Sequence, residues 1–179
     1  MTGAVDRRER FTAVYEENYH RILGYTLRRT NAEEAADVVA ETFLVAWRRL
    51  DQVPHGDQAR LWLYGTARRV LANHDRSRRR RLRLAEQARA DAVLAAQGPS
   101  APGPAGEAFS RLRTGERELL ALIGWEGLST AEIAVVYGCS ENAVRIRLHR
   151  ARSHFRKELD RVSAEPDPPA VMLVGKETS

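Results

Sequence analysis

The sequence has little of what several large protein classes require. It holds one cysteine, Cys139, among 179 residues, so an intramolecular disulfide cannot form. No apolar run approaches the ~20 residues that a membrane-spanning helix needs. The first twenty residues are charged and lack the apolar stretch of a secretory signal peptide. We therefore expect a soluble, cytoplasmic protein with no membrane insertion and no disulfide framework.

Metal and phosphate chemistry also lack their usual sequence signals. The five histidines are scattered along the chain: His20, His55, His74, His149 and His154. No glycine-rich phosphate loop occurs, and no cluster of carboxylates indicates a metal-dependent nuclease. The sequence predicts no catalytic residue, no metal site and no cofactor, so we do not expect an enzyme.

The charge of the chain is unevenly distributed. Lysine and arginine number 29 against 24 aspartates and glutamates, which gives a formal net charge of +5. An excess of this size favours an anionic partner but does not prove one. Arginines crowd into residues 76–83 and the last predicted helix, whereas acidic residues gather at residues 33–41. Two basic zones and one acidic helix predict two nucleic-acid contacts and a separate protein partner.

The chain has no convincing strand pattern and divides into two stretches of helical periodicity. The first covers residues 7–84, and the second covers residues 108–162. Between them, residues 85–107 include a run rich in glycine and proline (98–106), which predicts a flexible linker that cannot hold a helix. Residues 163–179 contain three prolines and predict a disordered tail. The expected fold is all-α, with two small helical domains joined by a flexible linker.

Residues 127–153 predict a helix-turn-helix, the motif that lays one helix in the major groove of duplex DNA. Ser129 stands three residues before Glu132, which is the spacing of a capping box at a helix start. Gly138 follows where the turn needs a positive φ. Ser140 is suited to cap the second helix, because its hydroxyl can accept an unpaired N–H.

The second helix of this motif carries an apolar stripe beside a basic one. The apolar residues recur at spacings of four, three and four: Val144, Leu148, Ala151 and Phe155. The basic residues repeat this spacing one position later: Arg145, His149, Arg152 and Arg156. Side chains near the helix start suit base edges, and later arginines suit phosphates. The predicted contacts are Ser140, Glu141, Asn142, Arg145, Arg147, His149 and Arg150. The alternative is an ordinary amphipathic hairpin with a solvated basic face.

An acidic helix is expected earlier in the chain, from a cap at Asn31 through Leu50. Asp37 and Glu41 stand four residues apart and project together on its outer face. Like charges at that spacing slightly destabilise an isolated helix. A binding surface for a basic protein partner would explain the pair, and a merely solvated face would explain it equally well.

A third helix, over residues 59–81, mixes aromatic and cationic side chains. Such a mixture suits single-stranded DNA, because bases stack on rings and phosphates pair with guanidinium groups. The predicted contacts are Trp62, Arg68, Arg69, Asn73 and Arg76. For Trp62 and Tyr64 the alternative is a position in the hydrophobic core, and for the arginines it is a solvated face.

Three segments in this order resemble bacterial extracytoplasmic-function sigma factors, the short class that keeps only the second and fourth sigma regions. They are residues 37–47, residues 59–73 with the arginines that follow, and residues 112–120 leading into the helix-turn-helix. The resemblance implies a protein that binds core RNA polymerase, brings it to promoter DNA and helps to open the duplex. It implies no covalent chemistry, and an anti-sigma factor is an expected partner.

The same resemblance assigns roles to the predicted surfaces. Asp37 and Glu41 would dock on a coiled coil of the largest polymerase subunit. The loop of residues 51–58 and the helix after it would take the −10 element, with a base flipped out of the non-template strand. The helix-turn-helix would read the −35 element as duplex. The alternative is a helix-turn-helix regulator that never enters polymerase, although such a regulator needs neither the acidic helix nor the aromatic one.

Overall fold

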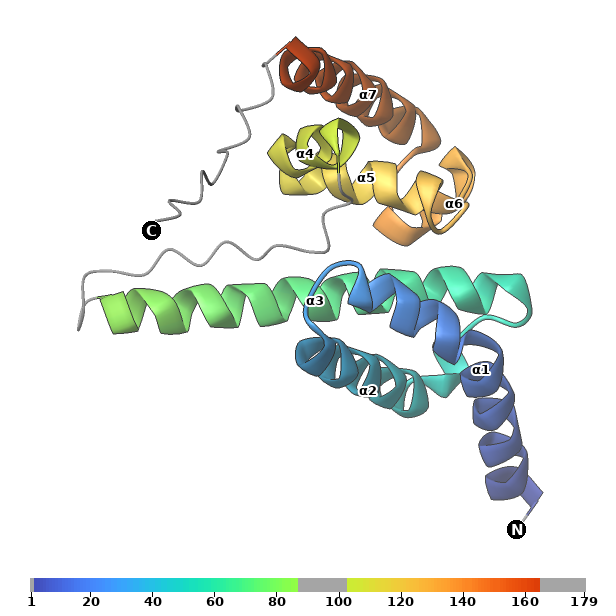
Figure 1. The fold of residues 1–179 in the computed structure, drawn as a ribbon. Helices are drawn as coiled ribbons and strands as arrows, with labels where there is room; N and C mark the ends of the chain where they lie inside the picture. The colour runs from blue at the N-terminus through green and yellow to red at the C-terminus, as the bar shows by residue number, and fades with distance from the viewer. Residues whose placement is uncertain (1, 87–102, 165–179) are drawn as a thin grey trace, which may run out of the picture.

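The computed structural model describes residues 2–86 and 103–164, and every regular element in those ranges is a helix (Figure 1). The first range contains α1 (Thr2–Leu27), α2 (Ala32–Arg48), a short 3-10 helix (Leu50–Gln52) and α3 (Asp57–Glu86). The second contains α4 (Pro104–Arg111), α5 (Thr114–Gly124), α6 (Thr130–Tyr137) and α7 (Glu141–Ala164). The all-α prediction is confirmed. None of these described helices is long and apolar enough to cross a membrane.

Local signals in the sequence fix where several helices begin. The Asn31 side chain caps α2 by accepting the backbone N–H of Glu34 at 2.9 Å. Ser129 and Glu132 form the predicted capping box of α6, since each side chain accepts the backbone N–H of the other. Caps of this kind stabilise a helix by about 1 kcal/mol each, because they pair N–H groups that have no partner inside the helix.

Helices reach into the predicted linker from both sides. α3 continues to Glu86, and α4 begins at Pro104, so the prediction that residues 98–106 hold no helix is wrong at its end. Proline fits a first helical turn because its φ is preset and its missing N–H would be unpaired there anyway. Gly103 supplies the turn before it with a φ of 96°. The rest of the predicted linker, 87–102, and the predicted tail beyond Ala164 lie outside the described residues.

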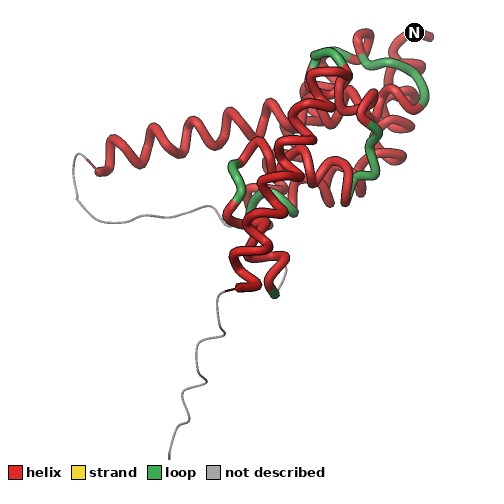
Figure 2. The backbone as a smooth tube through the Cα atoms, turned by 90° about the horizontal axis from the view of Figure 1, so that it is seen from above, coloured by secondary structure: helices red, strands yellow, loops and turns green. Residues whose placement is uncertain are grey.

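The buried residues of the first helical unit, α1 to α3, follow the predicted stripes. Ile22 of α1, Val38 of α2 and Leu63 of α3 are fully buried. In the second unit, α4 to α7, the apolar stripe of α7 is buried through Ala151, and Phe155 is half-buried. The far end of α3 projects away from both units, as the views in Figures 1 and 2 agree.

The two helical units are docked on each other, with α3 against α6. Their buried side chains form one continuous hydrophobic cluster that runs from Ile22 to Leu148. The helices approach so closely that a Cβ added at Gly65 would lie 3.2 Å from the carbonyl oxygen of Val136. The sequence predicted two domains joined by a flexible linker and no contact between them. The observed contact brings the second unit onto α3, the aromatic and cationic helix.

Candidate nucleic-acid and partner interfaces

α7 presents the predicted duplex-DNA residues on its open side. Its exposed members are Asn142, Arg145, Arg147, His149 and Arg150. The opposite side is fixed by Val144 and Leu148, which are 0% and 2% exposed. Ser140, also exposed, caps α7 by accepting the backbone N–H of Ala143 at 3.3 Å. Burial of one side therefore holds the basic side toward solvent, as insertion into a groove requires.

Glu141, which was predicted to contact DNA, is engaged within the motif. Its carboxylate accepts the Thr130 hydroxyl at 2.6 Å and the Arg145 guanidinium at 2.8 Å. The Thr130 hydrogen bond is the main reason that the pKa of Glu141 lies below its ordinary value. The carboxylate thus ties the starts of α6 and α7 together and orients Arg145.

The predicted single-strand residues lie along α3, but they differ in exposure. Arg69, Asn73 and Arg76 are exposed, and the last two are hydrogen-bonded to each other. Trp62 and Arg68 are half-buried. Tyr64 is only 2% exposed, so the core alternative holds for that residue.

A cleft of about 320 Å³ lies where α3 meets α6. Trp62, Arg68 and Arg69 line one wall, and residues 135–138 line the other. The Arg68 guanidinium carbon lies 4.1 Å from the centre of the Tyr137 ring, a cation–π contact. Burial raises the pKa of Tyr137 to about 12. The helix-turn-helix therefore covers part of the predicted single-strand surface.

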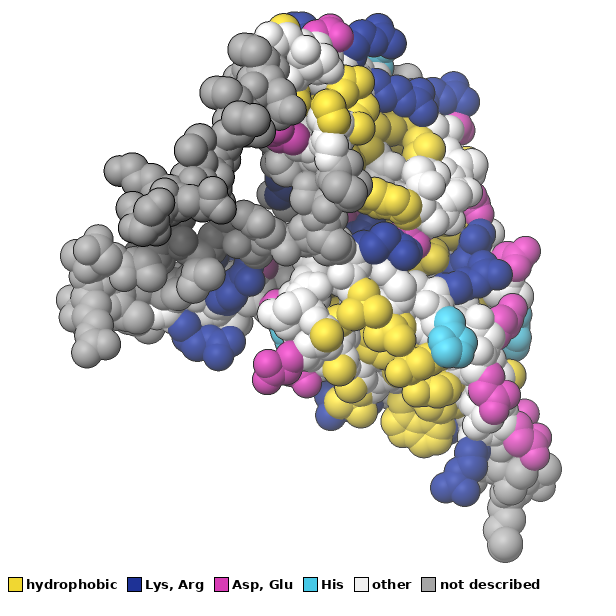
Figure 3. Space-filling model, in the orientation of Figure 1, with side chains coloured by type: hydrophobic (Ala, Val, Ile, Leu, Met, Phe, Trp, Pro, Cys, Tyr) yellow, Lys and Arg dark blue, Asp and Glu magenta, His cyan; other side chains and the backbone are white. Residues whose placement is uncertain are grey.

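The two carboxylates of the acidic pair on α2 have different surroundings in the structure. Asp37 is exposed as predicted, whereas Glu41 turns toward α3 and pairs with His74 Nε2 at 2.8 Å. The same helix exposes Leu44 (45%) and Trp47 (37%). Figure 3 shows a hydrophobic patch over this part of the molecule. The candidate partner surface thus carries Asp37 and the His74-paired Glu41, whose side chain is still 45% exposed, beside apolar side chains.

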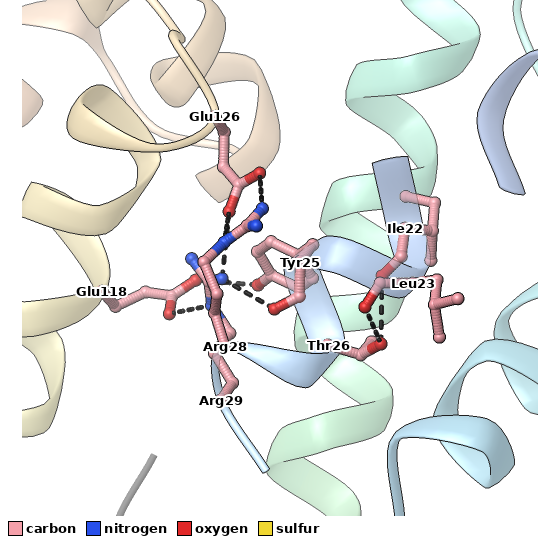
Figure 4. Close-up of polar contacts among 8 residues, drawn as sticks. All are labelled: Ile22, Leu23, Tyr25, Thr26, Arg28, Arg29, Glu118 and Glu126. Carbon is pink, nitrogen blue, oxygen red and sulfur yellow. Dashed lines mark hydrogen bonds and ion pairs between the residues drawn. The ribbon is translucent and has the colours of Figure 1, made fainter. Parts of the chain in front are cut away.

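An ionic network between the units was missed by sequence reasoning (Figure 4). Glu118 of α5 accepts the Tyr25 hydroxyl at 2.7 Å and Arg29 Nε at 2.7 Å. Glu126 accepts Arg28 Nη2 at 2.6 Å and Arg29 Nη1 at 3.1 Å. Burial, with the nearby Glu118 charge, holds the pKa of Tyr25 well above its ordinary value. No periodicity links these residues, which come together only through docking of the units.

The capping box of α6 makes a testable contribution to stability. Ser129→Ala should lower the free energy of unfolding by about 1 kcal/mol, because the backbone N–H of Glu132 at the start of α6 loses its acceptor. The pKa of Glu132 is held below its ordinary value mainly by the Ser129 backbone N–H, which alanine keeps, so the variant should raise this pKa only in part, through loss of the Ser129 hydroxyl. The carboxylate stabilises above the ordinary pKa, and this contribution is lost as the pH falls through the lowered folded value. Urea denaturation and an NMR titration measure the two effects.

A matched variant serves as the control for the capping box. Ser153→Ala removes an exposed hydroxyl in the middle of α7 and should change stability by less than about 0.5 kcal/mol. Equal losses in the free energy of unfolding of the two variants would show that the capping box does not stabilise the protein.

Comparisons with known proteins agree with this division into two units. Two family models match, "Sigma-70 region 2" over residues 14–81 and "Sigma-70, region 4" over residues 105–155. The chain is 30% identical over 151 residues to the ECF RNA polymerase sigma factor EcfG of Rhodopseudomonas palustris, covering 81% of this chain and 83% of that protein. It is 33% identical over 159 residues to the ECF RNA polymerase sigma factor SigL of Mycobacterium tuberculosis, covering 82% and 87%.

A solved structure gives the same picture of the fold. The sigma factor RpoE of Bartonella quintana, in complex with the anti-sigma factor NepR, superposes with a TM-score of 0.58. That alignment covers 89% of this chain and 97% of the other at 23% identity. At that identity, the likeness is one of fold alone.

Proposed function

Because the chain belongs to the extracytoplasmic-function sigma factors of RNA polymerase, we propose that it binds core polymerase and directs promoter-specific initiation of transcription. Members of this family are initiation factors and not enzymes, so the function rests on binding surfaces. The observation that carries the proposal is the presence in one chain of two candidate nucleic-acid surfaces of different kinds. One is the open basic side of α7, and the other is the aromatic and arginine-rich side of α3.

We propose that α7 reads the −35 element as duplex. The exposed Asn142 and Arg145 stand in the first turns of α7, which a recognition helix points at base edges. Arg147, His149 and Arg150 are exposed farther along, where side chains reach phosphates and fix the register. The same division of roles makes the two ends of the helix separable by experiment.

The −10 element is proposed to bind α3 as the melted non-template strand. Trp62 offers a ring for stacking, and Arg68, Arg69, Asn73 and Arg76 offer polar contacts along the same helix. The loop before α3 contains the exposed His55 and Gly56, and Gly56 has a φ of 59°. Holding an extruded base costs a few kcal/mol, so a pocket and flanking cations are both needed.

The proposed protein partners use other surfaces. Asp37, with Leu44 beside it, is proposed to dock on a coiled coil of the largest polymerase subunit. Glu41 would join this contact only after leaving His74. An anti-sigma factor is the proposed regulator, since family members are controlled in this way and the RpoE chain of the same fold was solved with one.

Run-off transcription on a genomic fragment library tests the function. The purified chain is assayed with and without core RNA polymerase, and new start sites are mapped. Start sites that need both components, with shared −35 and −10 elements upstream, would support the proposal. Protection of duplex DNA by the protein alone, with no start sites, would favour a helix-turn-helix regulator that acts outside the holoenzyme.

Two arginines on α7 separate base reading from phosphate binding. Arg145→Ala should reduce discrimination between matched and mismatched −35 duplexes by about 1–3 kcal/mol, because a base-edge contact is lost. Arg156→Ala should weaken binding to both duplexes equally and lower the salt dependence of the affinity. Fluorescence anisotropy at several salt concentrations measures both. The same loss of discrimination in the two variants would refute the division.

A further inference from the structure

We propose that, in the free protein, the second helical unit closes over the single-strand surface of α3, and that a charged clasp holds it there. The clasp is the set formed by Tyr25, Arg28, Arg29, Glu118 and Glu126. The proposal rests on the proposed function, since it concerns access to the same −10 surface. It adds a regulatory state that is built into the chain and requires no second protein.

The closed arrangement and strand binding compete for the same groups. Arg68 stacks on Tyr137 at 4.1 Å, so it must leave that ring before it can stack on a base or pair with a phosphate. Trp62 and Arg69 line a cleft whose other wall is α6. The backbone of α6 also touches α3, as the 3.2 Å approach of the Val136 carbonyl to a Cβ at Gly65 demonstrates. A strand that follows α3 therefore needs the space that α6 occupies.

Most of the charged side chains of the clasp are largely buried between the two units. The Glu126 side chain is 3% exposed, and those of Arg29 and Glu118 are 11% and 17% exposed, so these charges are largely removed from water. Removing one member of such a set leaves an uncompensated buried charge, which is strongly unfavourable. Here the units can separate and return that charge to water, so the strain is relieved by opening and not by unfolding. Arg60 and Glu132, 2.7 Å apart, form a second tie between α3 and α6.

Closure leaves the other DNA surface free. Arg145, Arg147 and Arg150 are all exposed while α6 sits on α3. The closed protein is therefore competent to meet duplex DNA but not to hold a melted strand. This asymmetry sets an order in which strand capture follows opening of the two units.

Distances between the units in the free, full-length chain test closure directly. Spin labels are attached at Thr12→Cys on α1 and Ser153→Cys on α7, both exposed, in a Cys139→Ser background. The unaltered clasp should give one narrow distance distribution. Glu118→Gln with Glu126→Gln should give a longer and broader one, with unchanged helix content by circular dichroism. A broad distribution in the intact protein, or no change in the clasp variant, would overturn the proposal.

Affinity for a single strand tests what closure does. The probe is a fluorescent thymidine oligonucleotide of about 12 nucleotides, a length within the range that one binding site contacts. The clasp variant should bind it about tenfold more tightly, because a mostly closed population reduces apparent affinity in proportion. Glu16→Gln with Glu17→Gln makes the same charge change on exposed residues of α1 and controls for charge alone. Equal gains in the two double variants would refute the covering of the strand surface.

A steric variant reaches the same state without changing any charge. Gly65→Ala crowds the Val136 carbonyl while favouring helix formation in α3. It should raise strand affinity by about threefold through the same population shift. Gly115→Ala, where an added Cβ meets nothing within 4 Å, is the matched control. Gains that are equal at the two positions would contradict closure by α6. Neither readout uses polymerase or a promoter, so failure of the transcription assay remains a separate result.

Discussion

Ile133→Ala is expected to lower the free energy of unfolding by about 2–5 kcal/mol, because it removes a fully buried side chain and leaves a cavity. Ile133 is 0% exposed in α6, the first helix of the helix-turn-helix. It belongs to the hydrophobic cluster that both helical units share. The substitution should therefore weaken the docking of the two units as well as the packing of the helix-turn-helix itself. Urea denaturation followed by circular dichroism measures it.

Val135→Ala is the matched control, two positions later on the same helix. Val135 is 56% exposed, so truncating it should change stability by less than about 0.5 kcal/mol. Duplex binding by the Ile133 variant should fall in parallel with its folded fraction, since the proposed base-reading side of α7 is untouched. Similar losses of stability in both variants would mean that the cavity at Ile133 collapses without cost.

Local signals made much of the fold predictable from sequence. A cap such as Asn31 or Ser129 acts through hydrogen bonds within one helical turn, so residue type and spacing are enough to locate it. The turn glycine Gly138 has the predicted positive φ of 64°, because the left-handed conformation is a local requirement. The stripes of α7 were predictable for the same reason, since packing of one side determines the exposure of the other.

Docking of the two units depends on information that no local pattern carries. Arg29 meets Glu118 across 89 positions of sequence, and nothing in the spacing selects it from the many other arginines. The pairing of Glu41 with His74 has the same origin, and it gives one of the two carboxylates predicted to face a partner a contact within the chain. Tyr64 illustrates the converse: an aromatic residue beside arginines fits a strand-binding surface and a core equally well until burial is known.

The candidate site was therefore predictable as a set of residues but not as an accessible surface. Asn142 and Arg145 are exposed as predicted, because their helix buries the opposite side within its own unit. Arg68 was identified on the right helix, yet its contact with Tyr137 depends on the position of a helix far along the chain. Exposure of a residue is a property of the whole assembly of helices, and periodicity constrains only one helix at a time.

Asp37→Arg is expected to weaken binding of the chain to core RNA polymerase about tenfold or more, because it reverses a charge at a proposed protein contact. The helix itself should tolerate the change. Arginine forms helices well, and at position 37 it stands four residues from both Glu33 and Glu41, where opposite charges stabilise a helix. A titration of fluorescently labelled protein with core polymerase measures the affinity. Circular dichroism should be unchanged.

Two further variants decide what a loss of affinity would mean. Glu17→Arg makes the same charge change at an exposed position on α1, so an equal loss there would reduce the effect to overall charge and remove the docking role of Asp37. His74→Ala releases Glu41 from its 2.8 Å partner without touching α2. If Glu41 joins the contact, this release should strengthen binding, and Asp37→Arg should then weaken it less, because a second carboxylate remains. Unchanged affinity in the His74 variant would assign the acidic contact to Asp37 alone, with Leu44 providing apolar area beside it.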